Sequence, residues 1–327
     1  MIFLEKILSL VMGLALIVGI RDQVKAAPVN LSQTFGCAPI GRVLGTGDQQ
    51  YPSGSLLCAG AKLRPQQGTV KFICYSSNQV LTLTTGKVWD VDKACGDPTT
   101  QTLPCSAQMR RSCLQVRGGR RQENPELLRP YGQIVLNPRP ALSWRAISEA
   151  DHYVVRVEGV GVKWRTEVRG TTLLYPQQEP GFRFGYAYEI EIVAYGNGQP
   201  LSASETVLMQ LPESVVQTVQ DEIRQIQALQ LPKSDLPWRD AVTVYRSQGL
   251  LSEAIALLET QVAQGGTHPK LYRMLADLYL ELGEAALAQT GYEQALKLAK
   301  KTQNREELHR AQAGLELVAI TTNSRPE

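Results

Sequence analysis

The last third of the chain repeats itself with a period of 34 residues. Moving residues 235–268 onto residues 269–302 places Tyr245 on Tyr279, Gly249 on Gly283 and Ala254 on Ala288. A fixed period of this length is typical of stacked supersecondary units, because each unit buries its apolar face only against its neighbours. The tail therefore predicts helix pairs packed in series.

Each unit carries the landmark residues of a tetratricopeptide repeat (TPR). An aromatic residue, Trp238 or Tyr272, opens the first helix, a glycine marks the bend, and an alanine lies where the two helices meet. The tail therefore resembles this family over two repeats, 235–268 and 269–302. The resemblance implies an all-α module whose first helices form a concave surface for a protein segment.

Transferred position by position, the resemblance places six side chains on that concave surface. They are Arg239, Thr243, Arg246, Arg273, Asp277 and Glu281. Thr243 and Asp277 occupy positions where the two-carboxylate clamp of some members has asparagine, so a receptor for chaperone tails is disfavoured. The mixed charge of the surface favours an unidentified protein partner. For each of these residues, an ordinary solvated helix face is the alternative interpretation.

Two repeats leave apolar faces uncovered at both ends of the array. Residues 214–230 and 305–320 each have apolar side chains at helical spacing, which predicts flanking helices that cap it. We therefore expect a helical domain over residues 213–327, with a core that it shares with neither β segment.

Residues 1–26 have the layout of a secretory signal peptide. Lys6 precedes an apolar run from Ile7 to Ile20, and small residues suited to signal peptidase follow at Val24 and Ala26. A helix that crosses a membrane takes about 20 residues, so this run is short for one. We expect export to the periplasm or the cell surface, with cleavage near Ala26 and Ala27. An uncleaved anchor is the alternative.

The cysteines lie in one segment that follows the predicted signal peptide. They are Cys37, Cys58, Cys74, Cys95, Cys105 and Cys113. An even number in an exported chain favours disulfides, and their spacing, without a nearby histidine, does not fit zinc. Six cysteines can pair in many ways, and the sequence does not choose among them. Pairing of sequence neighbours is our working prediction.

Short β-rich runs broken by glycine and proline fill residues 37–113 and predict a small β domain that depends on its disulfides. We assign this domain and a basic linker to residues 27–130. The linker holds most of the net positive charge of the N-terminal region, through the arginines from Arg110 to Arg121. It is either a solvated connector or a site for anionic polysaccharide or lipid. We expect no nucleic acid there, because no aromatic side chains alternate with the arginines.

Residues 131–212 alternate apolar and polar side chains with a period of two, which is typical of half-buried antiparallel strands. One face of the predicted strands carries Tyr153, Val155, Val157, Tyr186, Tyr188, Ile190 and Ile192. With Trp144 and Trp164, the order of landmarks resembles a fibronectin type III domain. The resemblance implies an antiparallel β-sandwich and no particular activity.

The sequence lacks the usual motifs of serine hydrolases, zinc peptidases and nucleotide hydrolases. Hydrophobic residues make up 43% and charged residues 20%, which argues against a disordered chain. We therefore expect a multidomain α+β protein: a disulfide-linked β domain, a β-sandwich and TPR-like helices. We expect an exported, non-enzymatic scaffold that needs no cofactor or metal and binds a protein partner. The alternative is a protein that attaches to the cell envelope, or binds an anionic ligand, through the basic N-terminal β domain and its linker.

Overall fold

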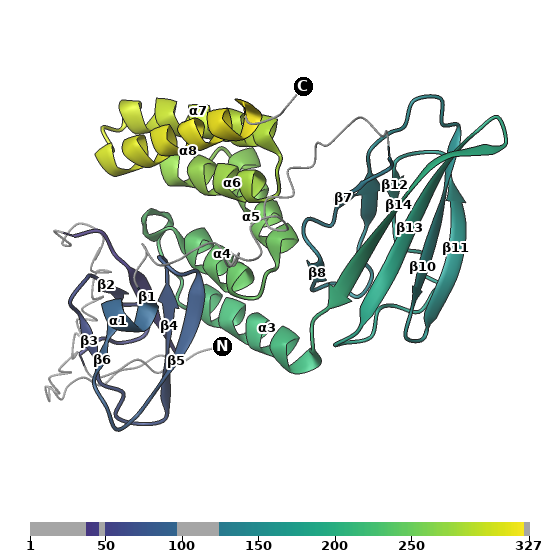
Figure 1. The fold of residues 1–327 in the computed structure, drawn as a ribbon. Coiled ribbons are helices and arrows are strands. Elements are labelled where there is room, and N and C mark those ends of the chain that lie inside the picture. The colour runs from purple at the N-terminus through teal and green to yellow at the C-terminus, as the bar shows by residue number, and fades with distance from the viewer. Residues whose placement is uncertain (1–36, 46–49, 97–123, 324–327) are drawn as a thin grey trace, which may run out of the picture. The chain divides into compact units, whose positions relative to one another are not determined.

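The computed structural model describes residues 37–45, 50–96 and 124–323, and these all belong to one compact unit. The fold is mixed α+β, with antiparallel sheets followed by helices, as the sequence predicts (Figure 1). The predicted signal peptide, Cys105, Cys113 and the arginines from Arg110 to Arg121 lie outside the described residues.

The N-terminal β unit, residues 37–96, contains two small sheets. Its larger sheet has the strand order β2-β1-β4-β5, with antiparallel neighbours. A second ladder joins β3 to β6, and the short helix α1 follows directly. The elements are β1 (Gly41–Gly45), β2 (Leu56–Leu57), β3 (Lys62–Leu63), β4 (Thr69–Cys74), β5 (Gln79–Thr84), β6 (Trp89–Asp90) and α1 (Val91–Cys95).

Two disulfides link this unit, Cys37 to Cys58 and Cys74 to Cys95. Both join sequence neighbours, which confirms the working prediction for four of the six cysteines. Cys74 and Cys95 lie inside the apolar core of the unit, whereas Cys37 is exposed. The Cys74–Cys95 bond therefore ties the end of β4 to α1 within the core.

The next segment forms two sheets around one core, to which Trp144 of one sheet and Tyr188 of the other contribute. The larger sheet has the order β11-β10-β13-β14-β8 and the smaller one β12-β9-β7. The elements are β7 (Leu127–Arg129), β8 (Ile134–Val135), β9 (Leu142–Trp144), β10 (His152–Gly159), β11 (Val162–Val168), β12 (Thr172–Leu173), β13 (Ala187–Gly196) and β14 (Gln199–Gln210).

Three details of this sandwich differ from the sequence prediction. β7 belongs to it, although the sequence places Leu127–Arg129 in the basic linker. β8 runs parallel to β14, so one edge is not antiparallel. Tyr186 precedes β13 and is 48% exposed, whereas Tyr188, Ile190 and Ile192 are buried as predicted.

The C-terminal region is helical from residue 213 onward. Its elements are α3 (Glu213–Ala228), a 3-10 turn η2 (Lys233–Asp235), α4 (Pro237–Ser247), α5 (Leu251–Ala263), α6 (Pro269–Glu281), α7 (Ala285–Lys301) and α8 (Arg305–Asn323). α4 and α5 lie within the first predicted repeat, and α6 and α7 lie within the second. Ala254 and Ala288 are completely buried at the helix contacts, because a small side chain lets the paired helices approach closely.

The expectation that the helical region shares no core with the β segments is wrong. Leu44 of β1 and Ile73 of β4 belong to the same buried cluster as Val219 of α3 and Val244 of α4. Lys71 of β4 also forms an ion pair with the buried Glu222 of α3, with an N–O distance of 2.7 Å. The N-terminal β unit is therefore packed against the first two long helices.

No helix in the described part of the chain combines the length and apolar character that a membrane crossing requires.

Candidate functional site

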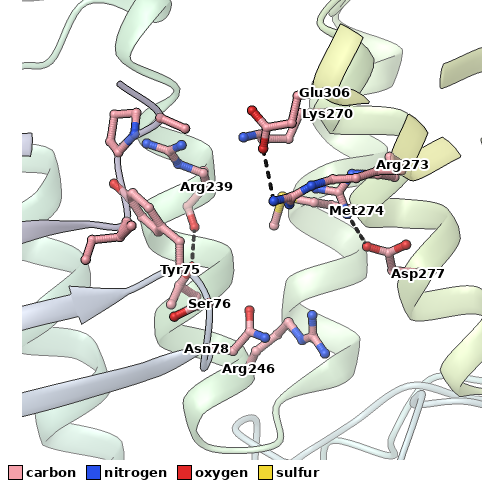
Figure 2. A pocket seen from close by; sticks show the side chains of 15 residues that line it. Tyr75, Ser76, Asn78, Arg239, Arg246, Lys270, Arg273, Met274, Asp277 and Glu306 are labelled. Carbon is pink, nitrogen blue, oxygen red and sulfur yellow. Dashed lines mark hydrogen bonds and ion pairs between the residues drawn. The ribbon is translucent and has the colours of Figure 1, made fainter. Parts of the chain in front are cut away.

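A cavity of about 550 Å³ lies between the N-terminal β unit and the helices (Figure 2). We call it the interface pocket. One wall consists of residues 38–40 and of the turn that follows β4, with Tyr75, Ser76 and Asn78. The other walls come from α4, α6 and α8, through Arg239, Thr243, Arg246, Lys270, Arg273, Met274, Asp277, Glu306 and Arg310.

The repeat places equivalent positions of α4 and α6 at this pocket. Each helix begins with a proline, Pro237 or Pro269, which suits the first turn because its missing N–H would have no helical partner. After each helix comes a glycine with positive φ, Gly249 at 71° and Gly283 at 78°, which lets the chain turn back. Arg239 and Arg273 therefore occupy matching places on successive first helices.

Five of the six residues predicted for the concave surface line the interface pocket. The sixth, Glu281, accepts a 3.0 Å hydrogen bond from Arg246, which does line it. The alternative interpretation, an ordinary solvated helix face, does not hold for three of them, because Arg239, Thr243 and Arg273 are only 6%, 1% and 9% exposed. The Thr243 hydroxyl donates to the backbone carbonyl of Arg239 within α4.

Arg273 is held by two carboxylates. Its Nε donates to Glu307 of α8 at 2.6 Å, and it also pairs with Asp277 one turn along α6. Burial alone would raise the pKa of Glu307, but the Arg273 guanidinium outweighs it, so this pKa lies below its usual value. Asp277 in turn accepts a hydrogen bond from the Tyr292 hydroxyl at 2.8 Å. The predicted binding residues Arg273 and Asp277 thus have structural partners of their own.

The N-terminal β unit supplies side chains that the sequence analysis missed. Arg42 of β1 and Asp240 of α4 form a buried ion pair at 2.8 Å, and the Tyr75 hydroxyl also donates to Asp240. The Arg239 guanidinium lies 3.6 Å above the centre of the Tyr75 ring. Burial, followed by the charge of Asp240, raises the pKa of Tyr75, so this phenol remains a hydrogen-bond donor. The sequence did contain one indication of this buried pair, because Arg42 is a charged residue within an otherwise apolar strand.

Comparisons with known proteins do not assign this chain to a family. No protein-family model matches the chain, and no curated protein matches its sequence. Among solved structures, PcrH in complex with the chaperone-binding region of PopD has 23% identity and a TM-score of 0.28. That match covers 34% of this chain and 85% of the other. PcrH from Pseudomonas aeruginosa has 20% identity and a TM-score of 0.25, and covers 33% of this chain and 92% of its own length.

Arginine and lysine dominate the chemistry of the interface pocket. Five cationic side chains line it, against the carboxylates of Asp277 and Glu306. Within residues 37–45, 50–96 and 124–323, no cluster of three or more histidine, cysteine, aspartate or glutamate side chains could hold a metal ion. The pocket is therefore suited to binding an anionic or polar group.

Proposed function

We propose that this protein is an exported, non-enzymatic interaction protein that holds a segment of a partner protein in the interface pocket. One observation carries the proposal: five of the six residues that the TPR resemblance assigns to a protein-binding surface line one cavity of about 550 Å³. Cavities of about 300–1,000 Å³ are the usual size of ligand sites in proteins. The TPR assignment of the helices and the fibronectin-like character of the sandwich are part of the same proposal.

The two disulfides of the N-terminal β unit support the export part of the proposal, because such bonds persist in oxidising compartments. The buried ion pair of Arg42 with Asp240 and the partly buried pair of Lys71 with Glu222 attach this unit to the helices. A partner segment would therefore contact the β unit and the helices together, and the helical region alone would offer an incomplete site.

The test is affinity capture from an envelope extract with the whole purified protein, followed by binding of the captured partner in purified form. The variant Arg246→Glu reverses a charge at the pocket, and Arg224→Glu is its matched control. Both arginines pair with one acidic residue, but Arg224 is an exposed residue of α3 outside the pocket. We expect the first variant to lose the partner and the second to keep it.

A partner that binds Arg246→Glu as well as the unchanged protein would contradict the proposal. If binding is lost only when Arg110 and Arg111 are reversed, and falls steeply with salt, the basic linker is the attachment site instead. Anionic polysaccharide or lipid is the partner predicted for that alternative.

A further inference from the structure

Arg239 forms no ion pair with any residue that the structure describes, although it is nearly buried. Its side chain is 6% exposed, and its Nε has no hydrogen-bond acceptor among the described residues. Burying a charge is costly unless it is paired, so nearly buried arginines normally have carboxylates beside them. Arg42 and Arg273 follow that rule in the same region of the molecule.

The carboxylate of the adjacent residue, Asp240, already has two other partners. Its Oδ2 accepts from Arg42 and its Oδ1 accepts from Tyr75. The Arg239 guanidinium at the same time lies over the Tyr75 ring, with its Cζ 3.6 Å from the ring centre, and this cation–π contact helps to hold the group in place. The stacked guanidinium lies beside the interface pocket, with Lys270 and Glu306 across the gap (Figure 2).

The other cations of the pocket are neutralised within the protein. Arg246 pairs with Glu281 and Arg310 with Glu306. Arg273 pairs with Asp277 and Glu307, and Lys270 shares Glu307 at 3.4 Å. Arg239 is therefore the one cation of the pocket lining that forms no ion pair with a described residue.

The charge of Arg239 also affects neighbouring groups. Burial and then the Arg239 charge lower the pKa of Lys270, and burial and then the Lys270 charge lower the pKa of His268. In each case a neighbouring positive charge adds to the effect of burial, and an incoming anion would offset that charge.

We propose that Arg239 and Lys270 together bind one carboxylate of the partner segment, with Tyr75 of the β unit holding the guanidinium in position. This inference rests on the proposed function and adds a chemical requirement to it: an acidic residue in the bound segment. A guanidinium presents paired N–H groups that match the two oxygens of a carboxylate.

The charges of the pocket favour a monoanion over a phosphate group. A phosphorylated side chain carries about −1.5 to −2 charges near neutral pH. Asp277 and Glu306 line the same pocket and would repel the additional charge. One carboxylate matches the single unpaired cation.

The test uses two synthetic pools of N-acetylated, C-amidated hexapeptides. In one pool a central position is always aspartate, in the other it is asparagine, and the remaining positions are mixtures of alanine, leucine and serine. Each pool is passed over the immobilised whole protein, and the retained peptide is measured by mass spectrometry. We expect the aspartate pool to be retained about tenfold more than the asparagine pool.

Variants locate the site. Arg239→Gln and Lys270→Gln are each expected to abolish the preference for aspartate, and the exposed Arg224→Gln is the matched control that keeps it. Circular dichroism establishes that each variant is folded. If Arg239→Gln does not fold, Lys270→Gln still tests the site, because Lys270 is not central to a core and is 17% exposed.

The outcomes separate this inference from the proposed function. Equal retention of both pools would overturn the carboxylate site and leave peptide binding intact. Retention of neither pool by folded protein would count against both. Displacement of the aspartate pool by inorganic phosphate, more strongly than by acetate at equal ionic strength, would assign the site to phosphate instead.

Discussion

Arg42 of β1 donates from Nε to Oδ2 of Asp240 in α4 at 2.8 Å, and the two side chains are only 1% and 0% exposed. Arg42 also donates to the backbone carbonyls of Gly54 and Asp235, so its guanidinium is fully engaged. Removing a charge pair this deeply buried from water costs free energy, and removing one partner leaves the other charge buried without a counter-charge. The pair is therefore a sensitive test of whether β unit and helices fold together.

We expect Arg42→Met to lower the free energy of unfolding by about 3–5 kcal/mol, and Asp240→Leu to do the same, because each leaves a buried charge without its partner. The double variant should lose clearly less than the sum of the two. Urea denaturation, followed by circular dichroism, measures all three. Losses that simply add would show that the two residues do not interact energetically.

The contact between α6 and α7 gives a second prediction. A Cβ added at Gly291 would lie 2.8 Å from the Cβ of Ala276, so Gly291→Ala should push the two helices apart. We expect a loss of about 1–3 kcal/mol in thermal or urea unfolding. Gly170→Ala is the matched control, since its added methyl group meets no atom within 4 Å. Equal stability of the two variants would contradict this helix packing.

The disulfides offer a comparison in which loop length is constant. Both enclose a sequence separation of 21 residues, so their effect on the unfolded chain is the same. Replacing Cys74 and Cys95 by alanine should lower the free energy of unfolding by about 3 kcal/mol, because the unfolded chain gains conformational entropy without the cross-link. The cavity left by the two buried sulfur atoms should lower it further. Replacing the less buried Cys37 and Cys58 should cost less.

The same comparison tests the shared core. Ile73 and Tyr75, on either side of Cys74, pack with α3 and α4. The Cys74/Cys95 variant should therefore lower the melting temperature of the helical signal, not only that of the strands. An unchanged helical transition would mean that the two parts unfold independently.

Stability should fall with acid in two steps. The pKa of His268 lies below its usual 6.5, first because of burial and then because of Lys270, so the folded state favours the neutral ring. The stabilisation is complete above pH 6.5 and is lost as the pH falls from there through the folded pKa. His268→Asn keeps an acceptor for the Lys270 N–H and should remove this step from a pH series of urea unfolding.

The second step belongs to Glu307, whose pKa lies below its usual 4.5. Burial opposes this shift, but Arg273 more than compensates for it. Its contribution is present above pH 4.5 and is lost as the pH falls through the folded pKa. Glu307→Gln should therefore lower stability at neutral pH and flatten the curve below pH 4.5. A curve that stays as steep as that of the unchanged protein would assign the step to another carboxylate.

The helices were predictable because their signals are local and repeated. A 34-residue period, two glycines at the bends and two small alanines define where each helix pair turns and touches. The alternation of Tyr153, Val155 and Val157 likewise predicted β10 and its buried face. In each case, one short stretch of sequence contains both the pattern and its physical cause.

The environment of the site was not predictable in this way. The repeat pattern identifies the positions of Arg239 and Arg273, but their burial depends on Tyr75 and Glu307, which come from other elements. Arg42 lies on β1, and its carboxylate partner Asp240 lies on α4. No periodic pattern in the sequence links these two elements. Contacts between distant segments produce no regular residue spacing, so one sequence by itself does not reveal them.

The packing of the N-terminal β unit on α3 and α4 also constrains the order of folding. Arg42 and Asp240 are separated by 198 positions, and Lys71 and Glu222 by 151. A ribosome makes the strands well before the helices that cover them, and contacts between such distant residues form slowly. Leu44 and Ile73 therefore remain uncovered until about three quarters of the chain, up to the end of α4, has been synthesised.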